Sequence, residues 1–236
     1  MPRYFGIEIL RFFTSLSVLL YHYRHFYSPF NSFSEIDNKV VFNEFPFSDL
    51  LNVFYLHGIY GVHVFYAISG FVFSYVYLNS KNLVKGKEFF LNRFARLYPL
   101  HFITLITIAL LQYFSLFKFG SFQIVEINDL YHFILQIFFI SSWGFEAGHS
   151  FNAPIWSVSI EIAIYILFFI FLIYLRKLKI KFVIGLSILL VVIDKILMVD
   201  SLFLECARLF FSGVLVYMIL DHFKKNKILF YISIIL

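Results

Sequence analysis

The sequence predicts an all-α fold, a polytopic transmembrane helical bundle, and three observations support this prediction. Hydrophobic residues make up 61% of the 236 residues, and charged residues make up only 14%, against roughly 25% in soluble domains. Several apolar windows are long enough to cross a hydrocarbon core of about 30 Å. Basic residues gather in the short loops between these windows. Lipid is therefore the expected surrounding of the chain, and a soluble enzyme, a nucleic-acid-binding module and a disordered protein are excluded.

About six full spans are expected, at residues 7–27, 53–78, 97–117, 155–175, 182–199 and 202–220. A further apolar window begins at residue 228 and reaches position 236, which is about half of a crossing, so we expect a truncated seventh span. Residues 130–143 form a shorter apolar run, of a length that favours a re-entrant or interfacial segment. Residues 1–236 are thus expected to form a single integral-membrane domain that is incomplete at its C-terminal side.

The charges of the loops predict the orientation of the chain. The loop between the second and third windows has one acid, Glu88, among five basic residues, so we expect it in the cytoplasm. The loop at residues 28–52 is acidic and is expected outside. Two further basic loops, at residues 176–181 and 224–227, lie on the inner side only if residues 130–143 do not cross. The N-terminus is then cytoplasmic.

The first span carries several polar residues that are costly in a bilayer. Glu8 and Arg11 are three residues apart and can pair on one face. His22 follows Arg11 by eleven residues, which returns to within about 20° of the same face after a rise of about 16 Å. Ser15 lies near the same stripe. This face is expected to turn toward the bundle interior; the alternative is a cytoplasmic Glu8–Arg11 cap and an interfacial histidine.

The fourth window begins with Pro154, which suits a helix start because its missing N–H would be unsatisfied there. Ser157, Glu161 and Tyr165 follow at four-residue spacing and share one face. An isolated glutamate in an apolar helix requires a partner, so Glu161 is either functional or part of a structural ion pair. Its candidate partners are Arg11, His22 and Arg208.

Arg93 and Arg96 share one face where the third span begins, before Tyr98 and Pro99. Their guanidinium groups suit phosphate recognition, although ordinary inner-loop arginines would also fit the charge rule. The stretch 58–70 contains Gly58, Gly61, Ser69 and Gly70, which allow helices or a ligand to approach closely. Two charged pairs near helix ends are interpreted as local pairs. They are Asp194 with Lys195 and Glu205 with Arg208.

Cys206 is the only cysteine, so an intrachain disulfide and a cysteine metal cluster are both excluded. The histidines and carboxylates show no spacing typical of metal ligands. We therefore expect no metal and no permanently bound cofactor.

Four blocks, taken in order, resemble the acyltransferase 3 family of bacterial membrane O-acyltransferases. They are Glu8-Ile9-Leu10-Arg11 with Tyr21-His22, then Gly61 to Phe71, Asn92 to Leu100, and Ile155 to Glu161 with Tyr165. A weaker fifth block contains Arg208, Phe211 and Gly213. The resemblance covers nearly the whole chain. Three positions depart from the family pattern. Glu8 is present where the family usually has an aspartate, His63 where it has an acid, and Ile162 where it has a second glutamate.

The resemblance implies an O-acyltransferase of the bacterial plasma membrane that acts on the cell envelope. It would move an acyl group, usually acetyl, from acetyl-CoA or another acyl-CoA to a hydroxyl of a glycan or lipid-linked saccharide. Arg93 and Arg96 would hold the CoA phosphates, and Arg11 would extend that path. His22 would act as the general base or relay the acyl group, with Glu161 orienting its ring. The supporting residues would be Glu8, Ser69, Tyr98, Trp156, Ser157, Tyr165 and Arg208.

Two alternatives stand beside this interpretation. Intramembrane Glu, Arg and His residues also line proton or solute paths, so a proton-coupled transporter or permease is one. The sequence has neither the internal repeat nor the paired broken helices typical of that class. The other is an inactive acyltransferase remnant, which the departures at His63 and Ile162 favour.

Overall fold

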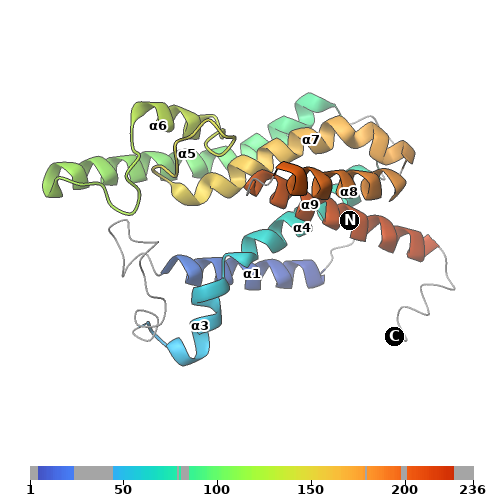
Figure 1. Cartoon of the computed structure of the whole chain (residues 1–236), viewed down its shortest axis with the longest axis horizontal. Coiled ribbons are helices and arrows are strands. Elements are labelled where there is room, and N and C mark those ends of the chain that lie inside the picture. The colour runs from blue at the N-terminus through green and yellow to red at the C-terminus, as the bar shows by residue number, and fades with distance from the viewer. Residues whose placement is uncertain are drawn as a thin grey trace. The chain divides into compact units, whose positions relative to one another are not determined.

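The computed structural model describes residues 5–23, 45–78, 80, 85–178, 180–197 and 201–225. Within these ranges the regular structure is helical throughout, which confirms the all-α prediction (Figure 1). In chain order the elements are α1 (Phe5–Tyr23), α3 (Ser48–His57), α4 (Tyr60–Tyr77), α5 (Gly86–Phe119), α6 (Leu130–Ile137), the 3-10 turn η2 (Ala153–Ile155), α7 (Trp156–Leu178), α8 (Ile180–Leu197) and α9 (Leu202–Lys225).

Four helical segments of the described chain are long and apolar enough to cross a membrane, and the bent pair α3 and α4 makes a fifth if it counts as one span. The four are α1, α5, η2 with α7, and α9. The chain is therefore a multi-pass membrane protein. Six full spans were predicted. The predicted span at residues 182–199 corresponds to α8. This helix carries three charged residues, Lys181, Asp194 and Lys195, within its 18 residues, so its crossing of the membrane stays a prediction. The seventh window and most of the acidic loop lie outside the described residues.

The second predicted span is broken. Instead of one helix over residues 53–78, α3 and α4 meet at an angle of 59° around Gly58 and Ile59. Glycine is required here because α1 passes very close: a Cβ on Gly58 would overlap the carbonyl oxygen of Ser17, and one on Gly61 would lie 2.7 Å from that of Thr14. The close approach predicted for this small-residue stretch is confirmed.

Helix α5 begins at Gly86, eleven residues before its predicted start at position 97. The apolar window missed residues 86–96 because they include charged side chains, yet lysine, glutamate and arginine are good helix formers. The helix continues through Pro99, although proline removes one backbone donor there. With 34 residues it is about 51 Å long, well beyond the thickness of a hydrocarbon core.

The run at residues 130–143 does not form a span. Its helix, α6, has 8 residues and a length of about 12 Å, and the chain then returns without regular structure to η2. Figure 1 shows α6 lying along α5. This geometry agrees with the predicted re-entrant or interfacial segment.

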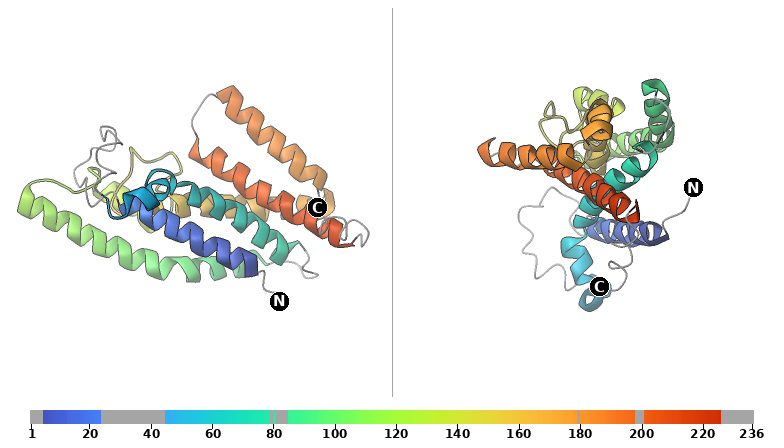
Figure 2. Two further views of the ribbon diagram at one scale, coloured as in Figure 1. Left: turned by 90° about the horizontal axis from the view of Figure 1, so that it is seen from below. Right: turned by 90° about the vertical axis from the view of Figure 1, so that its right-hand side faces the viewer.

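The residues group into two compact units, Met1–Val62 with Phe90–Ile162 and His63–Phe89 with Ala163–Leu236. In the second unit, α8 and α9 form an antiparallel hairpin (Figure 2). Gly70 and Gly213 bring α4 and α9 into backbone contact, since a Cβ on either would overlap a carbonyl oxygen of the other helix. The single domain predicted from the sequence stays a prediction.

Aromatic side chains fill the core of the second unit. Phe73 of α4 is buried and stacks on Tyr165 of α7 with a centroid distance of 4.4 Å. Phe168 and Phe210 meet the same ring edge-on, at 5.3 and 5.7 Å. Such offset and edge-on pairs add to the free energy gained by burial alone. Tyr165, predicted as a supporting residue, therefore lies in a packed aromatic cluster.

Candidate functional site

Helix α1 carries the first predicted motif without interruption. Arg11 Nη1 lies 3.6 Å from Glu8 Oε1, which confirms the predicted pair. Both side chains remain substantially exposed, so the pair adds little stability. Ser15 donates its hydroxyl hydrogen back to carbonyls of its own helix. His22 is half-buried in the last turn, with its ring edge-on to Tyr21 at 5.4 Å.

Arg93 and Arg96 both lie within α5. Because they are three residues apart in a continuous helix, they share one face, as predicted. Arg93 is half-buried and Arg96 exposed. Tyr98 is stacked between two phenylalanines of the same helix, Phe94 at 4.3 Å and Phe102 at 5.7 Å. The tyrosine thus belongs to an aromatic column along α5.

The fourth motif forms the start of α7 as predicted. Pro154 lies in η2, Trp156 is the first residue of α7, and Glu161 follows in the second turn, half-buried. Ser157 donates to the Pro154 carbonyl at 3.2 Å. Its hydroxyl hydrogen therefore helps to close the first turn.

The third and fourth motifs meet through Phe139, which follows α6. Its ring lies 5.9 Å from Tyr98 and 4.3 Å from His101, both on α5. Its carbonyl accepts a hydrogen bond of 2.8 Å from the buried Ser159 of α7. Ser159 Oγ also accepts the backbone N–H of Ser142 at 3.1 Å. Arg96 and Glu161 each lie two residues from this junction along their helices, a spacing that turns their side chains away from Tyr98 and Ser159.

Ser159 was not singled out from the sequence, although it lies inside the quoted fourth block. Its main-chain carbonyl accepts a further hydrogen bond, from the Trp143 indole N–H at 2.9 Å. One turn of α7 therefore fixes the segment that follows α6 at three points. The motif's second serine has a structural role that spacing alone could not reveal.

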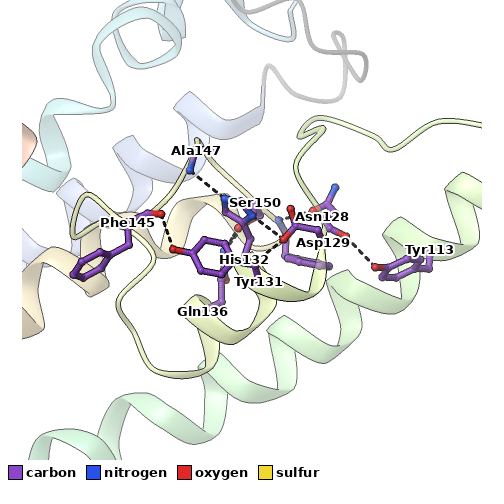
Figure 3. A network of polar contacts seen from close by, with 10 residues as sticks. Tyr113, Asn128, Asp129, Tyr131, His132, Gln136, Phe145, Ala147 and Ser150 are labelled. Atoms are coloured by element: carbon purple, nitrogen blue, oxygen red, sulfur yellow. Dashed lines mark hydrogen bonds and ion pairs between the residues drawn. The ribbon is translucent and has the colours of Figure 1, made fainter.

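A second polar network, also missed, fixes both ends of α6 and the segment after it (Figure 3). Asp129 caps α6: its Oδ1 accepts the backbone N–H of His132 at 2.8 Å and the ring Nδ1–H at 2.8 Å. The backbone bond is the main reason that the pKa of Asp129 is lowered, and the ring bond adds to it. The sequence signal was an aspartate before a helix start.

His132 resembles the histidine of a catalytic dyad, but its second nitrogen is already engaged. The backbone N–H of Ala147 donates to Nε2 at 3.1 Å, so Nε2 carries the lone pair and Nδ1 carries the hydrogen. The ring is buried, and both nitrogens serve the loop. This arrangement is structural, because no lone pair is left to accept a substrate proton.

Asn128 continues the network toward α5. Its carbonyl accepts from the Tyr113 hydroxyl at 2.9 Å, its Oδ1 accepts the Phe151 N–H at 2.7 Å, and its Nδ2 donates to the Val125 carbonyl at 2.8 Å. Asn152 then donates to Thr104 Oγ1 at 3.0 Å. The segment between α5 and α7 is therefore held by specific hydrogen bonds along its length.

In the second unit, the two predicted local pairs are wrong. Arg208 pairs with Asp194 Oδ2 at 2.5 Å, and Glu205 Oε1 lies 3.6 Å from His63 Nε2. The α8–α9 hairpin brings Asp194 and Arg208 together, while packing of α4 brings His63 to Glu205. His63, which departs from the resemblance pattern, thus lies beside an acid supplied by another helix. Ser69, the other predicted residue of α4, is half-buried.

Two of the three candidate partners of Glu161 already lie beside another carboxylate. Arg11 has Glu8 as a carboxylate neighbour, and Arg208 has Asp194. The pairing of Glu161 with His22 stays a prediction. Among the described residues, no group of three or more His, Cys, Asp or Glu side chains is placed to hold a metal ion.

Comparison with known proteins adds one finding. The family model described as an acyltransferase domain, acyltransferase 3, matches residues 4–236. Comparison with curated proteins and with solved structures gave no match. The match extends over both compact units.

Proposed function

The chain belongs to the acyltransferase 3 family and is a membrane acyltransferase, and we propose that it is an O-acyltransferase. It moves an acyl group, most simply acetyl, from acyl-CoA to a hydroxyl of a cell-surface glycan or lipid-linked saccharide. The plasma membrane of a bacterium, with the N-terminus in the cytoplasm, is the proposed location. The basic residues around the start of α5 support this orientation.

His22 is the proposed general base. Its imidazole takes the proton of the acceptor hydroxyl while the hydroxyl oxygen attacks the thioester carbonyl carbon. The C–S bond then breaks, and the CoA thiolate leaves with the proton from the imidazolium. Glu161 orients the ring and stabilises its charged form, as carboxylates do for other catalytic histidines.

Arg93, Arg96 and Arg11 are proposed to bind the donor. Guanidinium groups form paired, charge-assisted hydrogen bonds with phosphate oxygens, and CoA carries several phosphates. Two of these arginines are spaced one helical turn apart on α5, which suits a shared anionic ligand. The exposure of Arg96 leaves its side chain available to such a ligand.

The main support for this proposal is that α1 is one continuous helix. The helix has 19 residues without a break, and Arg11 and His22 are separated along it by about 16 Å on nearly the same face. With this separation, Arg11 can bind the acyl donor at one depth in the membrane, and His22 can take the proton of the acceptor hydroxyl at another. Arg11 also lies 3.6 Å from Glu8, one turn earlier on this face.

The direct test measures transfer from radiolabelled acetyl-CoA in membranes that contain the protein. His22→Ala should lower the rate at least about 100-fold, the usual contribution of a general base. His222→Ala is the matched control, because this exposed histidine of α9 is outside the proposed site. Undiminished transfer by folded His22→Ala would remove His22 from the role, and absence of transfer by the parent protein would support the inactive remnant.

Donor binding is tested separately by calorimetry with CoA. Arg93→Ala and Arg96→Ala should each weaken binding about tenfold or more, the effect of a lost charge-assisted hydrogen bond. Lys87→Ala, an exposed cation on the same helix, should leave the affinity nearly unchanged. Equal affinities for all three variants would exclude phosphate capture by these arginines.

A further inference from the structure

Positive charges gather where α7 ends and α8 begins. Arg176 and Lys177 lie in the last turn of α7, and Lys181 lies in the first turn of α8. Only one residue separates the two helices, since α7 ends at Leu178 and α8 begins at Ile180. This short connection keeps the three cations at one end of the second unit.

None of these cations has a carboxylate at ion-pair distance in the described part of the chain. Lys177 and Lys181 are exposed, so water can solvate them. Arg176 differs, because it is half-buried and its Nε is buried without a hydrogen-bond partner among the described residues. A partly desolvated cation is costly unless an anion lies nearby. An anion that the described chain does not supply is therefore expected near Arg176.

The Arg176 guanidinium is held on one side by α4. Its Nη2 donates to the main-chain carbonyl of Tyr77, at the end of that helix, at 2.6 Å. This bond uses one of several N–H groups of the guanidinium, and the carbonyl that accepts it carries no net charge. Arg176 remains partly accessible, and the next residue, Lys177, is exposed. A ligand would therefore contact the surface edge of the guanidinium, while the buried Nε would only share its charge.

The surface of α7 next to these charges is apolar. Three of its residues are exposed there by 50 to 55%: Ile170, Ile173 and Tyr174. Together with Lys177 they take the spacing i, i+3, i+4 and i+7, which is one face of a helix. Tyr174 stacks on Phe182, the residue after Lys181, at a centroid distance of 5.7 Å, so the start of α8 lies beside this face. An exposed apolar face thus runs along α7 and ends at the cations.

These features select a ligand that has both an anionic group and apolar chains. Guanidinium and ammonium groups bind phosphate oxygens through charge-assisted hydrogen bonds. A free phosphate or a nucleotide would leave the apolar face of α7 uncovered. A zwitterionic phospholipid would place a further cation beside the three that are already there. An anionic phospholipid meets both requirements, and basic residues next to the end of a membrane helix attract such lipids.

We propose that Arg176, Lys177 and Lys181 bind the phosphate of an anionic phospholipid, with an acyl chain of that lipid along Ile170 and Ile173. In the orientation proposed above, the lipid belongs to the cytoplasmic leaflet. It supplies the counter-charge of Arg176 and fixes the turn between α7 and α8 in the headgroup layer. None of these residues takes part in the proposed acyl transfer, so the two proposals are tested independently.

The test is native mass spectrometry of the full chain released from detergent micelles. The added probes are dioleoyl phosphatidylglycerol, which is anionic, and dioleoyl phosphatidylcholine, which is zwitterionic. The parent should bind the first phosphatidylglycerol at least about tenfold more tightly, because each basic residue near an anionic lipid contributes about fivefold. Equal affinities for the two lipids would overturn the proposal.

Variants locate the site. Lys177→Gln and Lys181→Gln change exposed side chains, so the fold should persist, and each should weaken phosphatidylglycerol binding about fivefold without affecting phosphatidylcholine. Arg176→Gln keeps an N–H donor for the Tyr77 carbonyl and should act in the same direction. Lys118→Gln is the matched control, since Lys118 is an exposed cation beside phenylalanine rings at the end of α5. Parent-like phosphatidylglycerol affinity in the Lys177→Gln, Lys181→Gln double variant would contradict the site.

Two competitors identify the source of the phosphate. Glycerophosphoglycerol, which is the headgroup without its acyl chains, should not displace phosphatidylglycerol at equal concentration, and neither should CoA. Displacement by glycerophosphoglycerol would show a site for phosphate alone. Displacement by CoA would assign the three cations to the acyl donor. Either result would reject the lipid.

Discussion

The Asp129 carboxylate accepts two hydrogen bonds from His132, one from its backbone N–H and one from its ring, each at 2.8 Å. One acid thereby caps α6 and fixes the tautomer of a buried imidazole. The other ring nitrogen accepts the Ala147 N–H, so the cap also positions the segment that returns toward α7. A local helix cap therefore governs a loop fifteen residues further along the chain.

Asp129→Ala should lower the melting temperature near neutral pH. The folded pKa of Asp129 is below its ordinary value, so the ionised carboxylate stabilises the fold. This stabilisation is complete above the pKa of an unfolded aspartate and disappears as the pH falls through the lower folded pKa. The melting curves of parent and variant should therefore converge in strong acid.

Glu126→Ala is the matched control for this titration, since Glu126 is an exposed acid of the same loop. A melting-temperature difference between parent and Asp129→Ala that is the same at every pH would reject the role of the ionised carboxylate.

Gly70→Ala and Gly213→Ala should each destabilise the protein by about 1 to 3 kcal/mol or more, because the new methyl group would overlap a carbonyl of the facing helix. Gly185→Ala on α8 has nothing within 4 Å of its added Cβ and should gain about 0.5 to 1 kcal/mol. Denaturant unfolding in detergent measures all three. Equal effects at the three positions would show that helix propensity, and not close packing, determines the result.

Local spacing predicted local features well. The Glu8–Arg11 pair, the helix start at Pro154 and the short α6 each depend on residues that are close in sequence. The continuity of α5 through Pro99 was not predictable from an apolar window, because charged helix formers precede it. The break between α3 and α4 depends on how closely α1 approaches Gly58, which is tertiary information.

The charged pairs also differ in whether neighbouring residues or tertiary packing determine them. Arg208 has an acid one turn away, Glu205, yet pairs with Asp194 across the α8–α9 hairpin. Burial of His101 and its contact with Gln136 likewise arise from packing between helices. The sequence motifs pointed to residues 92–100 of α5 and to the start of α7. The contacts that join these two regions are made by Phe139 and Ser159, which the sequence analysis did not single out.

The Asp194–Arg208 pair should be energetically coupled. Asp194→Asn leaves the half-buried guanidinium without its charged partner and should cost about 1 to 2 kcal/mol. A double-mutant cycle with Arg208→Ala should give a coupling energy of about 0.5 to 3 kcal/mol. Lys195→Gln, next to Asp194 but exposed, is the control. Additive effects of the two substitutions would contradict the pairing.

Ser159→Ala should be more harmful than Ser157→Ala. The first substitution leaves the Phe139 carbonyl and the Ser142 N–H without their hydroxyl partner, at a cost of about 1 to 3 kcal/mol. The second removes one hydrogen bond to the Pro154 carbonyl within the same turn and should cost about 0.5 kcal/mol. Thermal unfolding ranks the two, and the reverse order would show that Ser159 does not anchor the segment.

The native cysteine makes the orientation of the chain directly measurable. Cys206 is fully buried in α9, so the parent protein should react little with a membrane-impermeant maleimide. Lys87→Cys near the start of α5 and His149→Cys in the segment before α7 both introduce exposed thiols. Because the basic residues around Lys87 favour the cytoplasm, Lys87→Cys should react in inside-out vesicles and His149→Cys in intact cells. If α5 crosses the membrane in the opposite direction, the two labelling patterns will be exchanged; if both thiols react from one side, α5 does not cross at all.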